Sequence, residues 1–432
     1  MDARPRAEVI AVALPRRLSD IEAAFAYTHA LMHGTTQVTT HITVRGDLDP
    51  EHFRQGAERW AGGLPLLSLR IEERSDGLWF TSGPGPRAGQ IRHSRLAPPQ
   101  TPDDVLRQEL NDVLPTGGPL WRLRLVRDPR AGTAHLYFSR NHAISDGHST
   151  GAVVRALLDA LFGSAGASSP HDVRSMAPNG DELTYCPPGR PTAPLAARPE
   201  PVPFADHRPW CERGADFVPL ALTRRESLAL KARCKRVGVT VNQFFAAALA
   251  ESFAVATGRT EVALFTAVSL RKRYKESATL PDVGCFINVV DVPLRLDRGD
   301  LLDHARQYAT LLERTDAAWR PPVREHAAIR RAVEQTAAAG SAPGICITNV
   351  GVVDPALGPH TDRVTGYRTV VNRTGANYGV VLHLGTLGGE FRTALAFGTP
   401  STDPDMVRSV AKALHDRAVS PDAVCRSEVQ EV

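Results

Sequence analysis

The fold of this chain is decided by residues 137–149, which read YFSRNHAISDGHS. The aromatic start of this stretch is typical of a strand, and the apolar spacing that follows it is typical of an amphipathic helix. Between them lies a tight turn with the pattern H-x-x-x-D-G, formed by His142, Asp146 and Gly147. The segment therefore predicts a histidine at the end of a strand, where a rigid edge presents it to a ligand.

These residue types suit proton transfer. Histidine is the side chain whose unperturbed pKa lies closest to neutrality, so His142 is the candidate general base. Asp146 either orients the imidazole ring, as in a catalytic triad, or bonds elsewhere and holds the shape of the loop. Gly147 lets the backbone turn and leaves space beside the ring. A metal site has no support, because no second His/Asp/Glu pair stands at ligand spacing.

The sequence before the motif alternates helix and strand signals. Ser19-x-x-Glu22 is a capping box that predicts the start of a helix. Further expected elements are a strand at 36–45, a helix at 50–60, a strand at 64–71, a hairpin formed by 121–126 and 134–139, and a helix at 149–162. This order predicts an α/β lobe over residues 1–165.

A proline-rich stretch without periodicity follows, and residues 166–214 are expected to be a crossover linker. Thr240-x-x-Gln243 is a second capping box, which opens an alanine-rich helix ended by Gly258. Strands are then expected at 261–269, 287–294, 345–350, 367–371, 379–385 and 390–397, with helices at 223–232, 301–319, 323–339 and 403–417. Residues 215–432 are therefore predicted to form a second α/β lobe.

Composition excludes several classes of function. The net charge is +4 and the pI about 8.8, and the basic residues are nearly all scattered arginines, so nucleic acid is not an expected partner. The six cysteines form no C-x-x-C pair, which indicates reduced thiols and a cytoplasmic protein. The apolar run Val9–Leu14 is too short to span a membrane and is expected to be a strand.

The motif and its surroundings resemble the chloramphenicol-acetyltransferase-like superfamily of HxxxDG acyltransferases. That group includes condensation domains, alcohol acetyltransferases and polyketide-associated acyltransferases. The resemblance covers nearly the whole chain, because weaker landmarks follow in the expected order. These landmarks are Leu18–Glu22, Arg45–Asp49, Leu64–Arg70, Pro119–Leu123, Gly238–Asn242, Gly284–Asn288 and Thr348–Gly351.

The resemblance implies two chloramphenicol-acetyltransferase-like lobes that form a V around a solvent channel. His142 would be the general base that lets an acceptor hydroxyl attack an acyl thioester directly, without an acyl-enzyme. The acceptor would be a secondary metabolite or a lipid. The donor would be acyl-CoA or a phosphopantetheine-linked acyl group on a carrier protein, with no bound cofactor and no metal. We expect a monomer.

The same resemblance implies roles for other residues. Asp146 and Gly147 would support the motif, with Asp146 paired to an arginine of the second lobe, for which Arg271 is the best match. Asn349 is a candidate contact for the substrate or the developing oxyanion, with a plain turn as the alternative. Asn288 would be structural or would line the channel.

Two features depart from relatives. Condensation domains carry two adjacent histidines, and the first is here Asn141; this favours ester formation over peptide-bond formation. The D-F-G-W-G motif of the plant branch is not found near the C-terminus.

His148 is expected in the first turn of a helix, and His383 as a channel or core residue. The alternatives are a freestanding condensation enzyme joining carrier-bound units by an amide or ester bond, a catalytically silent scaffold, and a member retasked to a non-acyl reaction.

Overall fold

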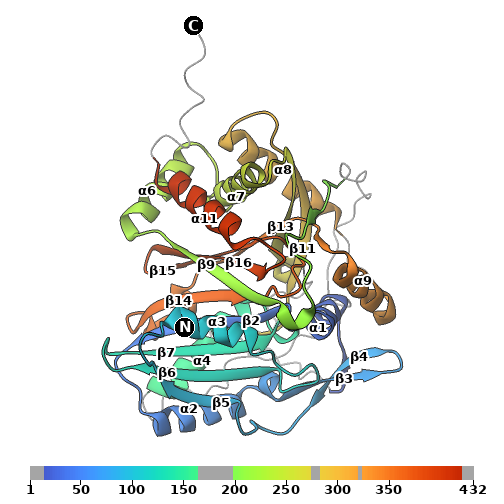
Figure 1. The fold of residues 1–432 in the computed structure, drawn as a ribbon. Coiled ribbons are helices and arrows are strands. Elements are labelled where there is room, and N and C mark those ends of the chain that lie inside the picture. Colours follow the sequence, from blue (N-terminus) through green and yellow to red (C-terminus); the bar gives the residue numbers. More distant parts are fainter. Residues whose placement is uncertain (1–13, 164–197, 274–282, 320–323, 421–432) are drawn as a thin grey trace, which may run out of the picture.

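The chain folds into two α/β lobes that lie one above the other (Figure 1). The computed structural model describes residues 14–163, 198–273, 283–319 and 324–420. The predicted α/β class with two lobes is confirmed. Of the expected linker, residues 166–197 lie outside the described residues, as do residues 9–13 of the expected first strand.

The first lobe is built on a five-stranded sheet with the order β14-β2-β7-β6-β5. Only the β5–β6 pair is parallel. Helices α2 and α4 pack against each other beneath this sheet (Figure 1). The elements are β2 (Gln37–Arg45), β5 (Ile91–Arg95), β6 (Trp121–Asp128), β7 (Thr133–Asn141), β14 (Val364–Val371), α1 (Asp20–Leu31), α2 (Pro50–Gly63), α3 (Pro102–Asn111) and α4 (Gly147–Phe162), with a small sheet of β1 (Arg16–Arg17), β4 (Gly77–Ser82) and β3 (Leu69–Arg74).

The second lobe is built on a six-stranded sheet with the order β11-β10-β13-β15-β16-β9. The central pairs β10–β13 and β13–β15 are parallel. Its elements are β9 (Gly214–Ala221), β10 (Glu261–Ser269), β11 (Ile287–Arg295), β13 (Ile345–Val352), β15 (Val381–Leu387), β16 (Glu390–Thr399), α6 (Arg224–Arg236), α7 (Val241–Thr257), α8 (Leu301–Ala318) and α11 (Pro404–Val419). Strand β8 (Val202–Pro203) pairs with β12 (Ser341–Ala342). Helices α9 (His326–Ala338) and α10 (Asp354–Leu357) follow in the second half of the chain but pack against α1 and α4 of the first lobe.

The capping signals of the sequence are confirmed. Ser19 and Glu22 form the capping box of α1, and Thr240 and Gln243 form that of α7. Gly258 ends α7 in the left-handed conformation, with φ of 66°. The alanines of α7 are buried, which lets this helix lie close to the sheet in the core of the second lobe.

Two expectations about elements are corrected. The strand expected over 64–71 begins only at Leu69, because Pro65–Ser68 form a 3-10 turn in which Leu67 N donates to Leu64 O at 2.9 Å. Strand β14 lies in the range expected for the second lobe, but it is an edge strand of the first-lobe sheet. Pairing with β2 covers an edge that would otherwise expose unpaired backbone groups.

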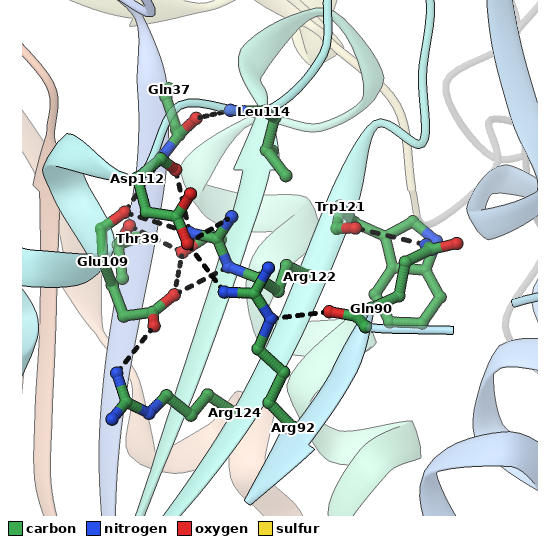
Figure 2. Close-up of polar contacts among 12 residues, drawn as sticks. Gln37, Thr39, Gln90, Arg92, Glu109, Asp112, Leu114, Trp121, Arg122 and Arg124 are labelled. Carbon is green, nitrogen blue, oxygen red and sulfur yellow. Dashed lines mark hydrogen bonds and ion pairs between the residues drawn. The ribbon is translucent and has the colours of Figure 1, made fainter. Parts of the chain in front are cut away.

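A buried polar cluster fixes α3 against the first-lobe sheet (Figure 2). Glu109 on α3 is 1% exposed and accepts from Arg122 Nε at 2.9 Å and from Arg124 Nη1 at 3.2 Å. Gln37 donates to Glu109 O at 3.0 Å. These contacts join α3 to β2 and β6, the two strands that hold β7 and therefore the position of the motif.

None of the helices in the described ranges is both long and apolar enough to cross a bilayer by itself. Only α6 and α7 taken together meet the length and composition, and they bend by 98° at the break between them.

Candidate active site

A cavity of about 230 Å³ lies between the two lobes. One side is lined by α1, the end of β7 and β14, and the other by β10, β11, β13 and β15. Because both lobes contribute, neither half of the chain could form the cavity alone. His142 is among its lining residues.

His142 follows the last residue of β7 and begins a short 3-10 turn, η2 (His142–Ile144). Its ring stacks on Phe25 of α1, with centroids 4.2 Å apart and planes 14° apart. Its Nδ1 atom is buried without a hydrogen-bond partner in the described part of the chain. Nε2 is therefore the ring nitrogen available to the cavity.

The surroundings keep His142 neutral. Burial and, after it, the positive charges of Arg140 and Arg373 lower the pKa of His142 to about 4, although its own backbone carbonyl and Asp146 act in the opposite direction. A neutral imidazole has a free lone pair, which is the form required of a proton acceptor.

Asp146 is committed to the loop and does not form a hydrogen bond with the imidazole. Its Oδ1 accepts from the N–H and the hydroxyl of Ser149, each at 2.7 Å, so Asp146 is the N-cap of α4. Its Oδ2 accepts from Phe286 N at 2.9 Å, and Asp146 N donates to Gly284 O at 3.0 Å. The carboxylate thus ties the start of α4 to the segment before β11 in the second lobe.

Arg271 completes this junction. Its Nη2 lies 3.5 Å from Asp146 Oδ2 and donates to Ser149 Oγ at 2.8 Å. Its guanidinium lies over the Phe286 ring, 4.2 Å from the centroid. The structure therefore brings Asp146 and Arg271 together across the lobes, in the arrangement that the resemblance implied.

Glycine is required at position 147 for a steric reason that differs from the expected one. It is the first residue of α4, and its φ is not in the left-handed region. A Cβ at this position would lie 2.6 Å from Val350 Cγ1 on β13. The missing side chain therefore allows the two lobes to approach each other beside the cavity.

The two asparagines do not line the cavity. Thr348 and Val350 of β13 do, so the alternation of the strand turns Asn349 to the other side. There Asn349 is exposed, donates to Asn242 Oδ1 at 3.3 Å and accepts from Gly351 N at 2.8 Å, which is the turn alternative. Asn288 likewise lies between two lining residues of β11, Ile287 and Val289.

The structure adds cavity residues that no motif indicated. His383 on β15 lines the cavity and is 6% exposed, so it is both a channel residue and a buried one. Arg140 and Arg373 also line the cavity and are 1% and 7% exposed. In the sequence, Arg140 could have been noticed as a charged residue in a strand that is otherwise largely apolar. Nothing in the sequence distinguishes Arg373 from the other arginines.

The comparisons with known proteins agree with this architecture. Residues 212–381 match the family described as phthiocerol/phthiodiolone dimycocerosyl transferase C-terminus. No curated protein matches the chain in sequence.

Solved structures share the fold over nearly the full length. TRI3 trichothecene 15-O-acetyltransferase from Fusarium sporotrichioides is 12% identical, with 94% of each chain covered and a TM-score of 0.68. The first condensation domain of the CDA synthetase is 15% identical, with 94% of this chain and 97% of that chain covered and a TM-score of 0.63. The starter condensation domain of rhizomide synthetase RzmA, in complex with C8-CoA, is 14% identical, with 94% of each chain covered and a TM-score of 0.61.

The chain shares its two-lobed fold with an acetyltransferase and with condensation domains, and its H-x-x-x-D-G turn faces the cavity between the lobes. The family that matches residues 212–381 is that of the polyketide-associated acyltransferases, which supports an acyltransferase.

Proposed function

We propose that this protein transfers an acyl group from a thioester to a hydroxyl of a secondary metabolite or lipid, with His142 as the general base. The observation that carries the proposal is the state of His142. It is neutral, it lies in the cavity between the lobes, and its Nε2 has no hydrogen-bond partner in the described part of the chain. A proton acceptor in such a position has no evident structural use.

In the proposed step, the acceptor oxygen attacks the thioester carbonyl while His142 Nε2 takes the hydroxyl proton. The tetrahedral intermediate then collapses, the C–S bond breaks, and the imidazolium returns the proton to the leaving thiolate. Atoms and charges balance without a protein nucleophile. The stacking of the ring on Phe25 holds the imidazole in one plane. Less conformational entropy is therefore lost when the transition state forms.

Asp146 has a positioning role in this proposal. Both of its carboxylate oxygens are engaged by Ser149, Phe286 and Arg271, so it fixes the turn after His142 and does not relay a proton. The charge of Asp146 still favours the imidazolium that forms during the reaction, because it raises the pKa of His142.

The donor is proposed to be acyl-CoA or an acyl group on a carrier protein. The C8-CoA complex of the rhizomide starter condensation domain supports the first, and the condensation domains of the same fold support the second. Asn141 favours ester formation over condensation of carrier-bound units. Its Oδ1 accepts from Ala143 N at 3.0 Å, so this residue caps the turn and does not line the cavity.

The test is acceptor-dependent release of free thiol from a panel of acyl-CoAs and of acyl groups loaded on carrier proteins. We expect His142→Ala to lower kcat/KM by about 10²- to 10⁴-fold, the usual contribution of a general base. His148→Ala is the matched control, because His148 is exposed in the first turn of α4, away from the cavity. Turnover that survives in a folded His142→Ala protein would refute the mechanism.

The same panel separates the donors and the products. Thiol release from CoA esters identifies a coenzyme A donor, and release only from loaded carrier proteins identifies a carrier-dependent enzyme. Amide products from amine acceptors would favour the condensation alternative.

A further inference from the structure

Arg373 occupies a fixed position in the loop between β14 and β15. Asn372 anchors this loop to the first lobe: its N–H donates to Gln37 O at 2.7 Å and its side chain donates to Leu110 O at 2.8 Å. Gly375 N donates to Thr35 Oγ1 at 2.7 Å. The backbone is therefore anchored on both sides of Arg373, while the side chain lines the cavity.

Among the described residues, no carboxylate compensates the charge of Arg373, whose guanidinium lies over the Tyr378 ring, 5.4 Å from the centroid. Its Nη1 donates to Asn377 Oδ1 at 3.2 Å, and its Nε is buried without an acceptor. In the ranges that the structure describes, no carboxylate forms an ion pair with this guanidinium, although the side chain is 7% exposed. Burial accordingly lowers the pKa of Arg373. A buried cation that no carboxylate compensates is unfavourable, so an occupant that supplies the missing charge is expected.

The other arginines of the cavity differ from Arg373. Arg368 is paired with Asp103 at 2.5 Å, and Arg392 is paired with Glu390. Arg140 has no carboxylate partner in the described part of the chain either, but its donors reach three hydroxyl groups, those of Ser145, Thr40 and Thr150. Only Arg373 combines an uncompensated charge with a buried donor that nothing accepts, as far as the described residues show.

His383 adds a second unpartnered group beside Arg373. It lines the same cavity, and its Nε2 is buried without a hydrogen-bond partner in the described residues. Burial, and after it the proximity of Arg373 and His142, lowers the pKa of His383 well below its ordinary value. A neutral imidazole has one donor and one acceptor nitrogen, so Arg373 and His383 both line one cavity with a ring or guanidinium nitrogen that has no partner among the described residues.

We propose that one of the two substrates of the proposed acyl transfer carries a carboxylate group that Arg373 binds inside the cavity, with His383 beside it. The inference rests on the proposed function and specifies its substrate class. A planar guanidinium matches a carboxylate in bidentate geometry. The phosphates of coenzyme A do not fit this role, because the pantetheine arm separates them from the thioester that must reach His142. The carboxylate lies on the acceptor or on the acyl chain of the donor.

Binding of an anion would also strengthen the base. Arg373 is one of the charges that lower the pKa of His142. A bound carboxylate would offset this charge and move the pKa of His142 back toward neutrality, where a general base is most effective. The substrate would then activate the group that reacts with it.

The test compares carboxylates with neutral isosteres in two arms. The donor arm pairs succinyl-CoA with its monomethyl ester, and the acceptor arm pairs hydroxy acids with their methyl esters. Product is quantified by mass spectrometry. We expect kcat/KM to favour the carboxylate in one arm by about 10- to 100-fold, the range for a charge-assisted hydrogen bond. The arm that responds identifies the substrate that bears the group.

Variants assign the preference to Arg373. Arg373→Met should bring the ratio close to one, and Arg373→Lys should keep part of it. The matched control is Arg392→Met, which removes a cavity arginine that already has a carboxylate partner and should leave the ratio unchanged. An active wild type without preference in either arm, or a preference that survives in Arg373→Met, would overturn the inference.

A binding measurement keeps the inference separate from the proposed function. Butyrate and succinate should raise the thermal midpoint of the wild type and of His142→Ala, while butyramide should not, and Arg373→Met should lose the response. If no thioester is turned over and this pattern holds, the carboxylate site stands and acyl transfer fails. An equal response to butyramide, or a response that persists in Arg373→Met, would refute the site.

Discussion

At the scale of single residues, the charges around His142 set the pH range in which it can act. The neutral form is the base, so activity is present above the pKa of His142 and lost as the pH falls through it. Because that pKa is about 4, we expect kcat/KM of the wild type to be nearly flat between pH 5 and 8. Arg373→Met removes a charge that lowers this pKa. The acidic limb of the pH profile of kcat/KM for this variant should therefore move toward 6.5, the ordinary pKa of histidine.

The measurement is product formation by mass spectrometry across this range, with a substrate that does not itself titrate there. A wild-type profile that declines with a midpoint near 6.5 would show that His142 is not shielded as the structure indicates.

At the scale of elements, the start of α4 joins the lobes through Asp146. Asp146→Ala removes the N-cap of α4 and leaves Arg271 without this carboxylate, so we expect the free energy of unfolding to fall by about 3–5 kcal/mol. Asp146→Asn keeps an oxygen for Ser149 N and should cost less. Urea denaturation compares the two variants. Normal stability of the Asp146→Ala protein would contradict this structural role.

The contact between α4 and β13 allows a second test at the scale of elements, through the stability of variants at Gly147 and Val350. Gly147→Ala places a Cβ 2.6 Å from Val350 Cγ1, which should destabilise the protein by about 1–3 kcal/mol. Val350→Ala in the same chain should recover part of that loss, because it removes the clashing methyl group. Additive effects in the double-mutant cycle would show that the requirement for glycine lies elsewhere.

At the scale of the whole molecule, several buried histidines couple stability to pH. Burial lowers the pKa of His29, His41 and His383, so between the folded and unfolded pKa values the unfolded chain binds more protons. The free energy of unfolding should therefore decrease as the pH falls below about 6.5, the unfolded pKa of histidine. Each histidine contributes up to about 1.4 kcal/mol per pH unit to this decrease. Urea titrations at pH 5 and 7.5 measure the difference, and equal stability would contradict it.

Local signals in the sequence were sufficient for many of the elements and for the position of His142 at the end of a strand. The capping boxes at Ser19 and Thr240, the helix stop at Gly258 and the H-x-x-x-D-G turn depend on neighbours in the chain, so their structure could be predicted directly. Two α/β halves followed from the order of the predicted elements, and their arrangement around a channel was implied by the family resemblance. The strand expected from Leu64 began late, because its apolar residues also suit a buried turn.

The tertiary structure decided what surrounds His142. Whether Asn349 faces the cavity depends on how β13 is oriented, and strand alternation turns it away. The place of β14 in the first-lobe sheet depends on which free edge the chain covers. Arg373 is one arginine among many in the sequence, and only folding brings it beside the cavity without a counter-charge. Local hydrogen bonds can be read along a chain, whereas charge compensation depends on residues far apart that only the packed lobes bring together.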